Sequence, residues 1–65
     1  MVTYRFKTFT KNEDTVYYHN FEEDYEAIKH ASIIFNTNRK IDLIEVFVDN
    51  KRLWYGYRGP EGGYS

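Results

Sequence analysis

The chain has 65 residues, of which 42% are hydrophobic and 20% aromatic, and it contains no cysteine. This length accommodates one hydrophobic core, the aromatic content argues against a disordered chain, and the lack of cysteine excludes disulfides and cysteine-ligated zinc. Nine Lys and Arg against ten Asp and Glu give a net charge of −1, which excludes binding of nucleic acid by charge alone. With no apolar leader and no stretch of membrane-spanning length, we expect a soluble cytoplasmic protein, of a cell or of an infected host cell.

Residues 2–9 alternate between apolar and polar side chains, which predicts a strand with one buried side. Tyr4 and Phe6 are expected to point into the core. Residues 11–14 are polar and of the types that form turns, so the chain should reverse there into a hairpin. The side chains on the outward side of this first strand would be Arg5, Lys7 and Phe9.

Residues 15–19 are β-branched and aromatic, which predicts the returning strand of this hairpin. A pairing of Phe6 with Tyr18 keeps the inward side apolar across both strands, whereas a slip by one residue would mix the two faces. The hairpin is therefore predicted with Tyr18 toward the core, and with Tyr17 and His19 on the outward side.

A helix is predicted to begin at Asn20, a capping type of residue, with Glu23 at the spacing of a capping box. Its apolar side chains recur at helical spacing, so one face should pack on the sheet. This stripe consists of Ala27, Ile28, Ala31, Ile34 and Phe35. The acidic residues at 22–26 suit the positive end of the helix dipole. Docking on a basic partner, or mimicry of nucleic-acid phosphates, is the alternative role for them.

Residues 41–48 and 53–58 are predicted as the strands of a second hairpin, joined by a two-residue turn or by a longer bulged loop. In the two-residue register Tyr55 faces the helix, while Trp54 faces away from it, beside Phe47. The residues of that turn would be Asn50 and Lys51.

The predicted fold is therefore α+β, with two β-hairpins flanking one helix (ββαββ). The four strands would form an antiparallel or mixed sheet with the helix on one face. Gly56 within the last strand indicates a bulge or a close approach opposite Glu45. Residues 1–58 would form the single domain and 59–65, which lack periodicity, a flexible tail. This plan resembles that of many small bacterial and phage proteins, a likeness that transfers no chemistry.

The outward face of such a sheet keeps aromatic and basic side chains that one helix cannot cover. Exposed aromatics with arginine are typical of protein interfaces, so we expect a non-enzymatic protein that binds a protein partner, as a small phage inhibitor does, or a second copy of itself. Binding of single-stranded nucleic acid or of a small ligand is the alternative, and aromatic pairs that only stiffen the sheet are a third interpretation. The candidate binding residues are Arg5, Lys7, Phe9, Tyr17, Phe47, Arg52, Trp54 and Arg58.

No catalytic residue, cofactor or metal site is predicted. His19 and His30 are the only histidines, and neither has further ligands at the spacing of a metal site. An ion pair between His30 and Glu26, one helical turn apart, is the expected role of that histidine. The serine and threonine residues lack a His–carboxylate set, and no glycine-rich phosphate loop precedes a helix. An enzyme is therefore not expected.

Overall fold

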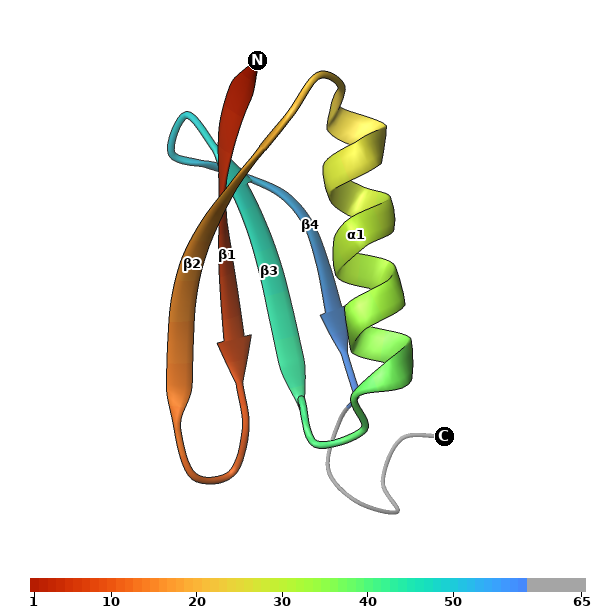
Figure 1. Cartoon of the computed structure of the whole chain (residues 1–65). Coiled ribbons are helices and arrows are strands. Elements are labelled where there is room, and N and C mark those ends of the chain that lie inside the picture. The colour runs from red at the N-terminus through yellow and green to blue at the C-terminus, as the bar shows by residue number, and fades with distance from the viewer. Residues whose placement is uncertain (59–65) are drawn as a thin grey trace.

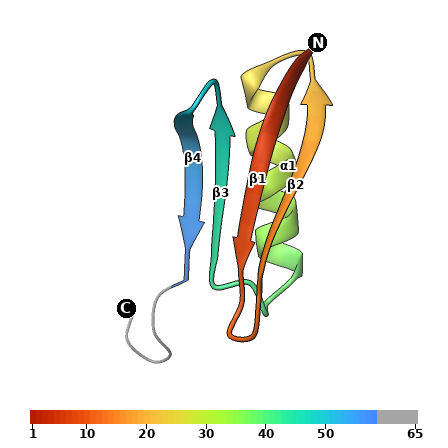
Figure 2. The same ribbon diagram turned by 90° about the vertical axis from the view of Figure 1, so that its left-hand side faces the viewer.

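The computed structural model describes residues 1–58, which form a four-stranded sheet with a helix packed on one face (Figure 1). The elements in chain order are β1 (Val2–Phe9), β2 (Asp14–Phe21), α1 (Asp24–Thr37), β3 (Leu43–Val48) and β4 (Lys51–Tyr57). The strands lie in the order β2-β1-β3-β4, and every neighbouring pair is antiparallel (Figure 2). The predicted ββαββ plan is confirmed, with an antiparallel rather than a mixed sheet. The predicted tail at 59–65 lies outside the described residues.

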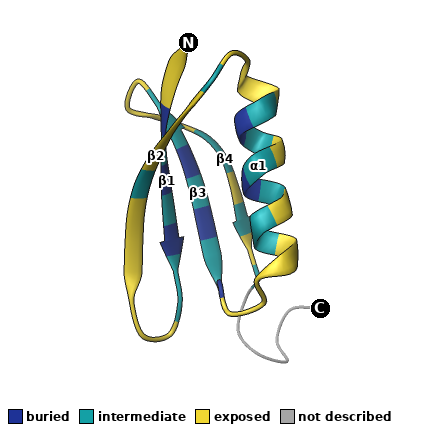
Figure 3. Cartoon of the chain, in the orientation of Figure 1, coloured by how far each residue is buried: buried dark blue, intermediate teal, exposed yellow. Residues whose placement is uncertain are grey.

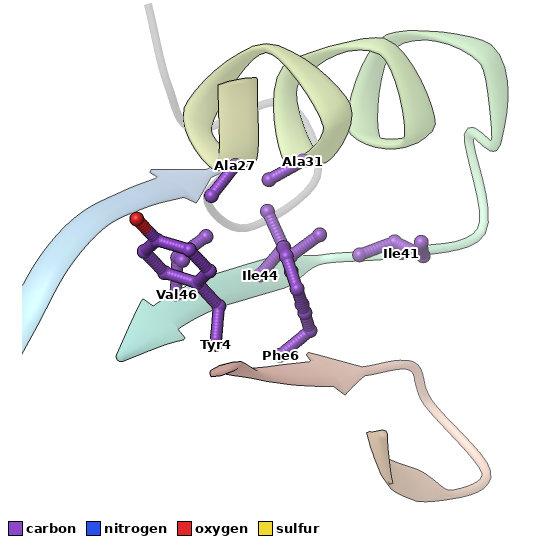
Figure 4. Close-up of a cluster of buried hydrophobic side chains, with 7 residues drawn as sticks. All are labelled: Tyr4, Phe6, Ala27, Ala31, Ile41, Ile44 and Val46. Atoms are coloured by element: carbon purple, nitrogen blue, oxygen red, sulfur yellow. The ribbon is translucent and has the colours of Figure 1, made fainter. Parts of the chain in front are cut away.

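The core lies between α1 and the two central strands, β1 and β3 (Figure 3). Ala27 and Ala31 are one turn apart on the helix and fully buried, and they project toward Tyr4 and Phe6 of β1 (Figure 4). Small side chains at these two positions let the helix backbone approach the sheet closely enough for the two large rings to fill the space. The buried core comprises Tyr4, Phe6, Ala27, Ala31, Ile41, Ile44 and Val46.

The predicted apolar stripe of the helix is confirmed. Besides the two alanines, Ile34 and Phe35 pack against the edge of the core, and Ile28 is half-buried. No helix within residues 1–58 is long and apolar enough to cross a membrane.

The first hairpin is shifted by one residue from its predicted register. Phe6 pairs with Tyr17 and not with Tyr18. The turn explains the shift, because the side-chain oxygen Oγ1 of Thr10 accepts hydrogen bonds from the backbone N–H groups of Asn12 and Glu13, at 3.2 and 3.1 Å. These bonds close a short loop and set the pairing of the strands that leave it.

This shift exchanges the two sides of β2. Tyr17, His19 and Phe21 now pair with inward-facing residues of β1 and lie on the helix side of the sheet, whereas Val16 and Tyr18 point outward. The predicted placement of Tyr17 on the outward side and of Tyr18 in the core is therefore wrong. His19 likewise lies on the helix side.

The second hairpin also departs from the prediction, because its turn lies one residue earlier. Asp49 and Asn50 have φ angles of 52° and 64°, both in the left-handed region that a type I′ hairpin turn requires. Aspartate and asparagine tolerate this conformation better than other non-glycine residues. The turn predicted at Asn50 and Lys51 is therefore wrong.

A β-bulge then reverses the sides of β4. Arg52 pairs with Phe47 and Trp54 pairs with Val46, which leaves Leu53 as an extra residue between them. Beyond the bulge Trp54 points toward the helix and packs against the core. Tyr55 and Tyr57 point outward and are 52% and 62% exposed. The predicted sides of Trp54 and the two tyrosines are wrong.

Gly56 is the site of the predicted close approach, although it pairs with Ile44 rather than with Glu45. A Cβ atom at Gly56 would lie 3.1 Å from Cδ2 of Phe35 and 3.2 Å from Cη2 of Trp54. The missing side chain makes room for both rings on the inner side of β4.

The helix begins later than predicted. Its N-cap is Glu23 rather than Asn20, because β2 continues to Phe21 and keeps Asn20 in the sheet. The carboxylate of Glu26 accepts hydrogen bonds at 3.0 Å from the backbone N–H groups of both Glu22 and Glu23. The acidic residues therefore satisfy donors at the helix start, as expected from the helix dipole.

Candidate binding face of the sheet

The side of the sheet that faces away from α1, here called the open face, has no element of the described chain over it (Figure 2). The strand pairing arranges its side chains in three rows that cross the sheet. The first row is Tyr18, Arg5, Phe47 and Arg52; the second is Val16, Lys7, Glu45 and Tyr55; the third is Asp14, Phe9, Leu43 and Tyr57.

The outer strands of this face carry its most exposed aromatic side chains. Tyr18 on β2 is 62% exposed, and the two tyrosines of β4 are more than half exposed. Val16 beside Tyr18 is 49% exposed. Isolated exposed apolar residues are common on protein surfaces, but several on one uncovered face mark an interaction surface.

The centre of the open face is a cluster of cations held over aromatic rings. The guanidinium carbon of Arg5 lies 4.7 Å from the ring centroid of Phe47. The Nζ atom of Lys7 lies 5.5 Å from the same centroid and 5.9 Å from that of Phe9. These distances are within the range of cation–π attraction, which holds both charges close to apolar surface.

The third cation of the face is neutralised by a neighbour. Nη1 of Arg52 lies 2.8 Å from Oε2 of Glu45, and its guanidinium lies 4.4 Å above the ring of Tyr55. This is the only ion pair found within residues 1–58. Arg5 and Lys7 therefore have no carboxylate partner in that part of the chain.

A shallow hollow of about 160 Å³ lies next to Arg5, at the end of the face nearest the β3–β4 turn. Its lining residues are Thr3, Arg5, Tyr18, Phe47, Asp49 and Asn50. The Nε atom of Arg5 is shielded from solvent and has no hydrogen-bond partner among the described residues. The hollow therefore borders a cation whose hydrogen-bonding capacity is not fully used.

A larger depression, of about 640 Å³, separates the β1–β2 loop from the loop between α1 and β3. Its charged side chains, Lys11, Glu13, Arg39, Lys40 and Asp42, have both signs, and most of its lining residues are exposed. Such mixed and solvated charges are ordinary for loops.

The structure places five of the predicted binding residues on the open face and three elsewhere. The five are Arg5, Lys7, Phe9, Phe47 and Arg52. Tyr17 stacks on Phe6 beneath the helix, with ring centroids 5.1 Å apart, and Trp54 packs against the core. The remaining predicted residue, Arg58, lies at the C-terminal end of the helix.

Arg58 joins the end of the sheet to the end of α1. Its Nη2 donates to the carbonyl of Phe35 at 2.8 Å, and its Nε donates to the carbonyl of Ile41 at 3.1 Å. The guanidinium also lies 4.1 Å from the ring centroid of Phe35. Because the last carbonyls of a helix lack intrahelical donors and carry partial negative charge, this arginine acts as a C-terminal cap supplied from another element.

His30 packs inward rather than pairing with Glu26 at the helix surface. Its ring lies 4.8 Å from that of His19 and 5.0 Å from that of Phe6, and its Nε2 is buried without a hydrogen-bond partner. Burial and the nearby His19 lower the pKa of His30, and burial raises the pKa of Tyr17 beside it. Residues 1–58 contain no group of three or more His, Asp or Glu side chains that could hold a metal ion.

Tyr4 shows how the acidic helix start is tied to the core. Its hydroxyl donates a hydrogen bond of 2.7 Å to Oδ1 of Asp24. This hydrogen bond and then burial raise the pKa of Tyr4 to about 12. The aspartate is thereby occupied in holding the helix start on β1.

Sequence reasoning missed Tyr18, Tyr55 and Tyr57, the most exposed aromatics of the open face. The turn at Asp49 and Asn50 was readable from residue type, but it leaves the sides of β4 unchanged, and only the bulge after Arg52 turns Tyr55 and Tyr57 outward. Comparison with protein-family models, curated proteins and solved structures yields no match.

Proposed function

We propose that this chain is a non-enzymatic binding protein that takes up a protein partner on the open face of its sheet. The observation that carries the proposal is the exposure of Tyr18, Tyr55 and Tyr57 on the one side of the sheet that the helix does not cover. Tyrosine and arginine are enriched among the residues that dominate the affinity of protein interfaces. The partner is another protein or a second copy of the chain.

The shape of the face supports a flat contact over an enclosed small ligand. The hollow beside Arg5 measures about 160 Å³, whereas pockets that bury a small ligand usually hold roughly 300–1,000 Å³. The aromatic and basic side chains instead spread over all four strands. A spread of this kind suits a partner that lies across the sheet.

Site-specific photocrosslinking in the native cell tests the proposal. A photoreactive phenylalanine derivative replaces Tyr55 on the open face or, as the control, Ile33 on the solvent side of α1, and these positions are equally exposed at 52%. We expect one adduct of defined mass from position 55 and none from position 33. An excess of unlabelled protein should abolish the adduct, whereas an excess of a Tyr57→Asp variant should not.

Adducts of equal yield from both positions, or none from either, would contradict the proposal. The adduct mass also separates the two kinds of partner. A mass of two chains identifies self-association, and any other mass identifies a different protein.

A further inference from the structure

We infer that the occupant of the open face is an acidic segment of another protein, whose carboxylates are bound by Arg5 and Lys7. This inference rests on the proposed function and specifies the chemistry of the partner. Three cations, Arg5, Lys7 and Arg52, stand in the middle of the face against one central carboxylate, Glu45, and a second carboxylate, Asp14, lies at the outer edge beside Phe9. Glu45 is committed to Arg52, so the charges on β1 remain unneutralised within the described chain.

The surroundings of these cations favour a carboxylate ligand. Arg5 and Lys7 lie over the ring of Phe47, where apolar surface replaces part of their hydration. A partly dehydrated guanidinium binds a carboxylate more strongly than a fully solvated one does, because the effective dielectric is lower. Arginine binds carboxylates through two-point hydrogen bonds, and no carboxylate within residues 1–58 forms an ion pair with Arg5.

A second copy docked symmetrically face to face fits this charge pattern poorly. Such a contact would place the cations of one β1 strand close to those of the other, while Glu45 of each copy is paired with Arg52 and Asp14 lies at the outer edge. Like charges brought together in an interface oppose association. A partner of opposite charge gains instead from the same arrangement.

Single-stranded nucleic acid fits the aromatic rings poorly. Bases bind such sheets by stacking on exposed ring faces, but Arg5 and Lys7 already lie over Phe47, and Arg52 lies over Tyr55.

The third row adds an apolar requirement to the acidic one. Phe9, Leu43 and Tyr57 form an uncharged stretch of the third row next to Lys7 and Glu45, and Asp14 ends this row on β2. A segment that places carboxylates over β1 therefore sets its neighbouring side chains over apolar surface. The fitting ligand is an acidic segment with interspersed aromatic or aliphatic residues.

Fluorescence anisotropy with three labelled probes tests this inference. The probes are a peptide of alternating Glu and Tyr, its counterpart of alternating Lys and Tyr, and oligothymidylate. We expect the Glu–Tyr peptide to bind the most tightly, and its affinity to fall as salt is added. Arg5→Gln and Lys7→Gln should each weaken it by about tenfold. Lys29→Gln removes the same charge from an exposed position on α1 and should leave the affinity unchanged.

Equal binding of the acidic and basic peptides would overturn the inference, and so would unchanged affinity in both open-face variants. Preferred binding of oligothymidylate would replace it with nucleic-acid recognition. The crosslinking at Tyr55 distinguishes the two levels of the account. If the adduct also forms in the double variant Arg5→Gln, Lys7→Gln, the open face binds a partner but the proposal of an acidic partner is wrong. If no adduct forms in the otherwise unchanged protein, the proposal of a binding face is itself wrong.

Discussion

Alanine substitutions at Trp54 and at its neighbour Tyr55 test which side chains of β4 belong to the core. Trp54 packs against the core cluster beneath the helix, with its ring edge directly over Gly56. Replacement of a buried tryptophan by alanine costs about 3–5 kcal/mol. Because Trp54 is only partly buried, we expect the lower end, about 3 kcal/mol.

Tyr55 should behave differently although it is the next residue. Its ring is 52% exposed, and its defined contact is the guanidinium of Arg52 at 4.4 Å. An exposed cation–π contact contributes about 0.5–1 kcal/mol. Tyr55→Ala should therefore lower the free energy of unfolding by about 1 kcal/mol or less.

Urea denaturation followed by circular dichroism measures both changes. A domain of this size holds about 3–5 kcal/mol in its core, so Trp54→Ala should retain little stability without urea. Tyr55→Ala should shift the midpoint slightly with an unchanged slope. If Tyr55→Ala costs more than Trp54→Ala, the bulge at Leu53 is wrong and the tyrosines belong to the core.

Two further changes probe the helix. Arg58→Gln removes hydrogen bonds to the carbonyls of Phe35 and Ile41, so the free energy of unfolding should fall by about 1–3 kcal/mol; a thermal melt that matches the wild type would contradict the capping role. The pKa of His30 is lowered in the folded protein. As the pH falls through the ordinary histidine range near 6.5, the unfolded chain therefore binds more protons than the folded one does. Stability should be full above that range and decline below it. Melts between about pH 7.5 and 5.5 should show this decline in the wild type and a smaller one in His30→Leu; equal slopes would contradict it.

The elements with one-sided patterns were predictable from the sequence. The alternation around Tyr4 and Phe6 identifies the inner side of β1, because polar residues separate them. The spacing of Ala27 and Ala31 identifies the inner side of the helix in the same way. Both assignments agree with the buried core.

The sides of β2 and β4 were not predictable from the alternation, because both strands carry aromatic residues on adjacent positions. Tyr17 and Tyr18 are equivalent by hydrophobic pattern, as are Trp54 and Tyr55. In β2, the hydrogen bonds to the hydroxyl of Thr10 set the register and so decide which tyrosine faces the helix. In β4, the one-residue bulge decides between Trp54 and Tyr55, because it reverses the side of every residue that follows.

The candidate site was predictable where it depends on the central strands. Once the inward sides of β1 and β3 are identified, alternation along the strand predicts that Arg5, Lys7 and Phe47 point outward. All three lie on the open face. Strand parity alone predicts Arg58 on the outward side with Trp54, whereas its partners are carbonyls of distant segments, Phe35 and Ile41, which no local pattern reveals. The exposure of Tyr18, Tyr55 and Tyr57 was not predicted, because it depends on the registers of the outer strands β2 and β4.

Hydroxyl-radical footprinting of the tyrosines tests the central claim, that the open face binds a protein partner, most directly. The oxidation rates of Tyr18, Tyr55 and Tyr57 are measured in the purified chain and in the native cell extract, relative to Tyr25, which is 66% exposed on α1. The account predicts that the three sheet tyrosines become protected relative to Tyr25 in the extract. Protection of Tyr25 with unchanged sheet tyrosines would contradict it and would place the contact at the acidic helix start.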